Sequence, residues 1–233
     1  NFIKYLKTNR LDLLVSMSYD QIFKNEIINA VKKKIINCHA GKLPFYRGRS
    51  VLNWVLINGE KEFGITTHFV NEHIDKGNII NQKIIKISKK DDFKSLLYKS
   101  YSECSRLLYK SVKQIQNNRY QSIPQNKFSK KSSYYIKRKS GDEIINPKKS
   151  ALEIQNFVRG LVKPGPYAKI KLKENLLYVK KVSIIKKKNG LDSNTLKFKN
   201  GKFFFLAGDK KTVSIDNWVL KKKIGNKGLM KLI

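Results

Sequence analysis

The chain has 233 residues, 40% of them hydrophobic, which is enough to bury the core of one large or two small domains. No segment reaches the roughly 18 unbroken apolar residues of a transmembrane helix, and the first residues lack the features of a signal peptide. Cys38 and Cys104 are too few for a disulfide framework and form no CxxC pair, so we expect a reducing, cytoplasmic setting and no metal.

The net charge of +33 arises from 50 basic and 17 acidic residues. Two explanations stay open: the lysine bias of an AT-rich genome, or attraction of an anionic ligand such as a nucleotide, phosphate, RNA or an acidic membrane. Because the lysines are spread over the whole chain, without clustered arginines and aromatics, the charge indicates an anionic ligand and no more.

The first elements predict a parallel sheet. Residues 11–18 and 35–37 contain unbroken apolar runs typical of buried strands, and residues 20–34 between them have helical apolar spacing. Ligands bind beyond the carboxyl ends of strands in such sheets. Asn37 and His39 lie at such an end and, two residues apart, point to the same side.

The next elements extend this α/β region. Residues 50–60 predict a helix, and residues 64–71 and 78–88 predict two strands joined by the turn EHIDKG. Residues 91–118 predict a long amphipathic helix that begins near two aspartates, Asp91 and Asp92, a favourable arrangement with the helix dipole.

The remaining residues predict a linker and a second domain. Residues 119–141 are rich in serine and lysine, and the following helix begins with Ser150 and Glu153 in a capping-box pattern. Residues 167–220 predict short alternating strands, with turn signals at 189–190, 200–201 and 208–209. We therefore predict a catalytic α/β domain over 1–118, a linker over 119–141, and a helix with a small, mostly-β, OB-like subdomain over 142–233.

Three polar residues form the candidate chemistry: Asn37, His39 and Asp75. Taken singly, a histidine beside a strand and an aspartate in a turn are more often structural. Their combination indicates a site, because the two segments that carry them bring their loops to one edge of the same sheet.

These segments resemble a known family. INCHAGKLPFYRG (36–48) and GITTHFVNEHIDKGNIINQ (64–82) are similar to the 10-formyltetrahydrofolate-dependent formyltransferases. That family includes methionyl-tRNA formyltransferase, glycinamide ribonucleotide formyltransferase and the sugar N-formyltransferases of surface-polysaccharide (lipopolysaccharide) synthesis. The residues that match its pattern are Asn37, His39, Leu43, Pro44, Arg47, Gly48, Asp75 and Gly77.

The resemblance implies catalytic roles for three of these residues. An amine attacks the formyl carbon, and the Asn37 amide holds the developing oxyanion, an interaction that contributes a few kcal/mol per donor. His39 adds positive charge if it is protonated, or takes the amine's proton if it is neutral. Asp75 raises the pKa of His39 and relays protons through a bound water.

The resemblance also implies where the co-substrate 10-formyltetrahydrofolate binds. Its pteridine would lie between two loops that carry Tyr19, Gln21, Ile22, Phe23, Val70, Asn71, Glu72, His73 and Ile74. The alternative that Ile22, Phe23 and Val70 are ordinary core residues stays open. His68 is expected to be a structural residue of a strand, and His73 a loop residue.

Two further stretches indicate which kind of molecule carries the amine that accepts the formyl group. Residues 142–170 resemble a segment shared by the tRNA and sugar enzymes, although Pro147 replaces the usual tryptophan. GKLPFYRGRSVLNW (41–54) is more similar to the sugar enzymes, which implies a nucleotide-linked amino sugar, contacted by Lys42, Arg47 and Arg49; methionyl-tRNA is the alternative. Arg47 could equally fix the loop.

Several alternatives stay open at this stage. The chain lacks the first half of the sheet that the resemblance implies, so we expect an N-terminally truncated Rossmann-like formyltransferase sheet. A non-catalytic RNA-binding protein, or a structural partner of a formyltransferase subunit, would explain some features but not the spacing of the three candidate residues. Whether the chain forms a homodimer is undecided.

Overall fold

The computed structural model describes residues 2–9, 11–19, 21–32, 34–173, 175–185 and 195–221. Its helices are α1 (Phe2–Thr8), α2 (Asn25–Ile28), α3 (Val51–Ile57), α4 (Phe93–Gln116), the 3-10 helix η1 (Gln125–Lys127) and α5 (Ala151–Arg159). Its strands are β1 (Leu14–Ser16), β2 (Ile35–His39), β3 (Arg47–Gly48), β4 (Glu62–Phe69), β5 (Ile79–Lys86), β6 (Tyr134–Tyr135), β7 (Ala168–Leu172), β8 (Asn175–Ile185), β9 (Lys197–Lys199), β10 (Lys202–Leu206) and β11 (Thr212–Leu220).

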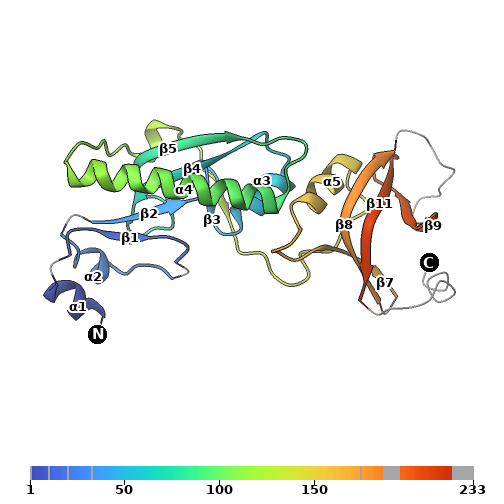
Figure 1. Ribbon diagram of the computed structural model, residues 1–233, viewed down its shortest axis with the longest axis horizontal. Helices are drawn as coiled ribbons and strands as arrows, with labels where there is room; N and C mark the ends of the chain where they lie inside the picture. Colours follow the sequence, from blue (N-terminus) through green and yellow to red (C-terminus); the bar gives the residue numbers. More distant parts are fainter. Residues whose placement is uncertain are drawn as a thin grey trace. The chain divides into compact units, whose positions relative to one another are not determined.

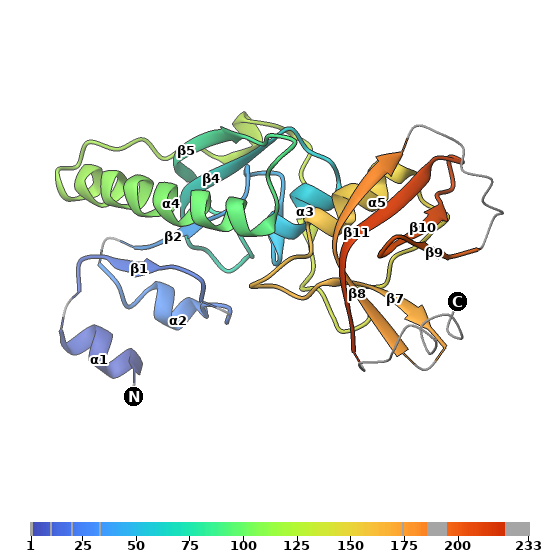
Figure 2. The ribbon, with the colours of Figure 1, turned by 45° about the vertical axis from the view of Figure 1, so that its right-hand side comes forward.

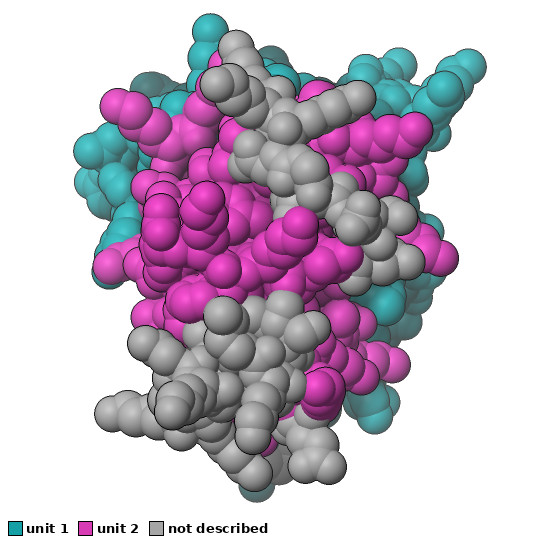
Figure 3. All heavy atoms as spheres, turned by 90° about the vertical axis from the view of Figure 1, so that its right-hand side faces the viewer, with its two compact units in different colours: residues 1–52, 61–88, 96–137 teal, residues 53–60, 89–95, 138–233 magenta. Residues whose placement is uncertain are grey.

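The chain divides into two compact units, which Figure 3 colours separately. Unit 1 comprises residues 1–52, 61–88 and 96–137, and unit 2 comprises residues 53–60, 89–95 and 138–233. No helix within the described ranges is long and apolar enough to cross a membrane.

Unit 1 contains a four-stranded sheet in the order β1-β2-β4-β5 (Figure 1). β1 and β2 run parallel, as the sequence predicts, and β4 and β5 form the predicted hairpin. β2 and β4 are antiparallel, with Asn37 opposite His68 and His39 opposite Thr66. The sheet is therefore mixed, and the α/β class is confirmed.

Both faces of this sheet are covered, because neighbouring side chains of β2 point to opposite faces. Ile35 packs with Leu6 of α1 and Val31. Ile36 packs with Phe69 and with Ile115 of α4 on the other face. By the same alternation, Asn37 and His39 share the face of Ile35.

The helix predicted over residues 20–34 is wrong for most of its length, because only Asn25–Ile28 is helical among the residues of this stretch that the structure describes. The β-branched and Asn residues of this stretch have low helix propensity. Most of its apolar side chains are nevertheless buried or partly buried in one cluster, which contains Phe23, Ile27, Ile28, Ala30 and Val31, whereas Ile22 is exposed. The apolar spacing therefore predicted which residues are buried, except for Ile22, but it predicted the helix incorrectly.

The segment predicted as a linker, residues 119–141, is built into unit 1 up to residue 137. It contains η1 and β6, and β6 pairs in parallel with β3. The predicted boundaries of the domains remain a prediction.

Unit 2 has a five-stranded antiparallel sheet in the order β7-β8-β11-β10-β9. Helix α5 packs on it through Ile154 and Val158, and Figure 2 shows α5 beside β8. The predicted capping box is present: Ser150 Oγ accepts a hydrogen bond from the Glu153 backbone N–H. The mostly-β second region is thus confirmed, and the turn predicted at 189–190 lies outside the described residues.

Candidate active site

The site is built around the turn between β4 and β5. Asp75 adopts a left-handed conformation there, with φ of 51°. A Cβ on Gly77 would collide with the backbone carbonyl of Phe69, so only glycine fits two positions after the aspartate. The Asp-x-Gly pattern therefore has a steric basis in this turn.

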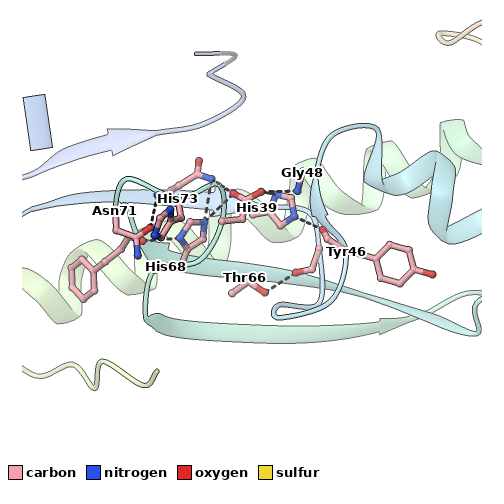
Figure 4. A network of polar contacts seen from close by, with 12 residues as sticks. His39, Tyr46, Gly48, Thr66, His68, Asn71 and His73 are labelled. Atoms are coloured by element: carbon pink, nitrogen blue, oxygen red, sulfur yellow. Dashed lines mark hydrogen bonds and ion pairs between the residues drawn. The ribbon is translucent and has the colours of Figure 1, made fainter. Parts of the chain in front are cut away.

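The structure brings the three predicted residues together. Figure 4 shows the surrounding network of polar contacts, with His39, His68 and Gly48 labelled. Asp75 Oδ2 lies 3.6 Å from His39 Nδ1 and accepts a hydrogen bond of 2.9 Å from the Gly48 backbone N–H. Asp75 Oδ1 lies 3.5 Å from Asn37 Nδ2 and 3.4 Å from His68 Nε2. The side chains of His39 and Asp75 are 10% and 11% exposed, so the cluster is nearly, but not wholly, closed to solvent.

Asp75 is held in its ionised form. Burial alone would raise its pKa, but the neighbouring His39 and His68 and the Gly48 N–H outweigh burial and hold the pKa of Asp75 well below its ordinary value. A buried carboxylate is thus available beside the imidazole of His39.

Asp75 is not the dominant influence on the pKa of His39. Burial lowers the pKa of His39, and the opposing effects of Asp75 and the Tyr46 carbonyl do not compensate. His39 Nε2 donates to that carbonyl at 2.6 Å, since a carbonyl oxygen can only accept. Neutral His39 therefore carries its hydrogen on Nε2, and its free lone pair is on Nδ1, beside Asp75.

His68 belongs to the cluster, although the sequence indicated only a strand residue. Its Nδ1 donates to the Phe69 carbonyl at 2.8 Å, which in the neutral ring leaves Nε2 as the acceptor for Asn37 Nδ2 at 3.3 Å. His68 therefore orients the Asn37 amide. The pairing of β2 with β4 places His68 opposite Asn37, and no local pattern in the sequence indicated this register.

The loops predicted to bind the folate lie near each other in unit 1. Asn25 Nδ2 donates to Glu72 Oε2 at 3.2 Å, which links the two loops. Ile22 is 62% exposed, so it is not a core residue, whereas Phe23 and Val70 pack together in one apolar cluster. Their neighbours Tyr19 and Ile74 are 50% and 40% exposed.

Other members of these loops bond mainly within their own loop. Tyr19 donates to Gln21 Oε1 at 3.2 Å, and the His73 backbone N–H donates to Asn71 Oδ1 at 3.1 Å. The folate contacts predicted for these nine positions remain a prediction.

The residues predicted for the acceptor differ in their surroundings. Lys42 Nζ forms an ion pair of 2.6 Å with Glu62. Arg47 donates from Nη2 to Ser132 Oγ at 2.8 Å, a contact that fixes its loop. Arg49 is exposed. Among the residues that the structure describes, no group of three or more His, Cys, Asp and Glu side chains could hold a metal ion.

Comparisons with known proteins point to one family. Residues 1–112 match the model of the formyl transferase family. The chain is 38% identical over 193 residues to the bifunctional polymyxin resistance protein ArnA of Wigglesworthia glossinidia brevipalpis, over 82% of this chain and 28% of that protein. It is 33% identical over 185 residues to the methionyl-tRNA formyltransferase of Thermodesulfovibrio yellowstonii. That match covers 79% of this chain and 59% of that protein.

A solved structure agrees with these matches. The N-formyltransferase from Helicobacter canadensis, in complex with folinic acid and dTDP-3-aminofucose, is similar with a TM-score of 0.67 and 27% identity, over 86% of this chain and 72% of that one. The similarity to the formyl transferase family therefore extends over residues 1–112, nearly half of the chain. It spans 28% and 59% of the lengths of the two curated relatives.

Proposed function

We propose that the protein transfers a formyl group from 10-formyltetrahydrofolate to the primary amine of a nucleotide-linked amino sugar. The observation that carries this proposal is the meeting of the Asn37 amide, the buried His39 imidazole and the Asp75 carboxylate, with Asp75 Oδ2 3.6 Å from His39 Nδ1 and Asp75 Oδ1 3.5 Å from Asn37 Nδ2. None of the three has to act as a covalent nucleophile, as suits direct transfer from one nitrogen to another.

The geometry supports a base role for His39. As the amine nitrogen bonds to the formyl carbon, the amine proton passes to Nδ1 of His39, directly or through one water, because Nε2 is occupied by the Tyr46 carbonyl. The new imidazolium then faces ionised Asp75, whose charge stabilises it. When the bond from the formyl carbon to the folate nitrogen breaks, that nitrogen takes the proton.

Asn37 is the proposed donor to the oxyanion. Its Nδ2 contacts to His68 and Asp75, at 3.3 and 3.5 Å, are long for hydrogen bonds, so the amide can turn a hydrogen toward a developing negative charge at small cost. One such donor typically contributes about 3 kcal/mol to the stabilisation of a transition state.

Two observations favour a nucleotide-linked amino sugar as the acceptor. The Helicobacter canadensis relative was solved with dTDP-3-aminofucose, and its match covers more than two thirds of both chains. In the loop that follows His39, Arg49 is exposed and offers a positive charge to a diphosphate.

Methionyl-tRNA is the second candidate acceptor, favoured by the 33% identity to a methionyl-tRNA formyltransferase and by the net charge of +33. An assay separates the two: 10-formyltetrahydrofolate is incubated with a panel of nucleotide-linked amino sugars or with methionyl-tRNA, and formylated product is measured by mass spectrometry. Since the chain spans only part of its relatives, the longest natural form containing it is used. Transfer to a sugar supports the proposal, transfer to the tRNA replaces the acceptor, and no transfer to either overturns it.

A further inference from the structure

Residues 122–135 lie in the stretch predicted as a linker, and we call them the brace. At one end the brace holds the Asp75 turn. Ile123 and Ile79 exchange backbone hydrogen bonds of 2.8 and 2.9 Å, and Asn78 Nδ2 donates to Ser122 Oγ at 3.1 Å. These contacts lie just beyond the turn itself.

One side chain of the brace bonds to the turn directly. Gln125 Nε2 donates to the Asp75 carbonyl at 2.6 Å and to the Gly77 carbonyl at 3.0 Å. The amide group has two hydrogens, so both can be used on these two backbone acceptors. Gln125 is thus fixed to the residue whose carboxylate meets His39.

The other end of the brace holds the loop between β2 and α3. Ser133 accepts from the Tyr46 backbone N–H at 2.9 Å through Oγ and from the Arg47 N–H at 3.0 Å through its carbonyl. The ring of Tyr135 stacks on that of Tyr46 with centroids 4.8 Å apart. This loop supplies the Tyr46 carbonyl to His39 and the Gly48 N–H to Asp75, so one segment supports both sides of the cluster.

We propose that Gln125 is a positioning residue for Asp75. A left-handed conformation costs a non-glycine residue about 1–2 kcal/mol, so a turn with Asp75 at φ of 51° needs outside support. The two hydrogen bonds from Gln125 give that support and keep the Asp75 carboxylate against His39 and the Gly48 N–H. The catalytic consequence of this role rests on the proposed function.

The first test is Gln125→Glu, which preserves size and shape but places an acceptor oxygen against two carbonyl acceptors. Because a small misplacement of a catalytic group can cost on the order of 100-fold, we expect kcat to fall about 10- to 100-fold while both KM values stay unchanged. Gln121→Glu, at an exposed position just before the brace, is the matched control and keeps the parent kcat. An unchanged kcat in Gln125→Glu, or an equal loss in the control, overturns the inference.

A second readout needs no substrate. The chain has three histidines, so their ring resonances can be followed by NMR in the ligand-free protein. Gln125→Glu is expected to shift the His39 and His68 signals, while Gln121→Glu leaves them in place; unshifted signals in Gln125→Glu contradict a positioning role. If Gln125→Glu does not fold, Gln125→Met, which is uncharged and similar in length, carries the same test. A parent that transfers no formyl group overturns the proposed function, and the NMR shifts then decide the role of Gln125.

Discussion

At the scale of single residues, the site follows from the chemistry of a few side chains. That Asn37, His39 and Asp75 lie together could be predicted from their places at the ends of sheet segments and from the resemblance to the formyltransferases. The protonation of His39 could not be predicted, because it depends on burial by a loop whose path no local pattern determines. Gln125 gave no signal either, since it lies in a polar stretch without periodicity.

Gly41 is predicted to be essential for the contact between His39 and Tyr46. A Cβ at this position would collide with both His39 Nε2 and the Tyr46 carbonyl oxygen. Gly41→Ala should therefore destabilise the fold by about 1–3 kcal/mol and also reduce turnover per folded molecule, measured by urea unfolding and by the transfer assay.

Gly141→Ala is the control for this change. A Cβ added there would meet no atom within 4 Å beyond its chain neighbours, but the φ of 101° makes alanine strained. It should cost folding free energy and leave turnover per folded molecule unchanged. Parent-like turnover in Gly41→Ala would contradict the role given to the His39–Tyr46 contact.

At the scale of elements, apolar spacing predicted which residues are buried better than which backbone they adopt. The stretch before β2 packs most of its apolar side chains as expected, with Ile22 exposed, yet among its described residues only Asn25–Ile28 is helical. The brace lacked apolar periodicity because backbone and side-chain hydrogen bonds, not burial, attach it to unit 1. Helix α5 was predicted well, since its cap is encoded by adjacent residues.

Ser150→Ala is predicted to destabilise unit 2. Ser150 Oγ accepts from the Glu153 N–H at 3.3 Å, and loss of an N-cap side chain typically costs about 1 kcal/mol. Both tryptophans, Trp54 and Trp218, belong to unit 2, so tryptophan fluorescence during urea unfolding reports on it. Ser140→Ala, at an exposed position, should leave the midpoint unchanged; equal midpoints for Ser150→Ala and the parent would contradict a stabilising cap.

At the scale of the whole molecule, the fold class and the family followed from the sequence, whereas the acceptor did not. The charge of +33 attracts a diphosphate and a tRNA alike, so composition cannot separate them. The specificity of an enzyme for its acceptor rests on the side chains that contact the acceptor. Two of the residues predicted to do so already bond to other residues of unit 1: Lys42 to Glu62 and Arg47 to Ser132.

The buried cluster also predicts how stability depends on pH. The folded pKa of His39 lies below its ordinary value of about 6.5, so the unfolded chain binds this proton more readily as the pH falls. The free energy of unfolding should therefore decrease on acidification below about pH 6.5, and more steeply below about pH 4, where unfolded Asp75 is protonated first. The free energy of unfolding can be measured by denaturant titrations at a series of pH values between 8 and 3.

The variant His39→Gln separates the contribution of His39 to this pH dependence from the contributions of the other titrating groups. In this variant the decrease between about pH 6.5 and 5 should become shallower, while the loss at lower pH persists. A variant with the same pH dependence as the parent in that range would show that His39 is not buried in its neutral form.

The most direct test of the account is the rate of formyl transfer by Asp75→Asn, measured with saturating donor and acceptor beside the parent. Asparagine has nearly the same shape, but it lacks the negative charge that stabilises protonated His39. We predict a fall in kcat of about 100-fold or more, with the fold retained. Turnover close to that of the parent would contradict the central claim that the cluster of Asn37, His39 and Asp75 performs the transfer.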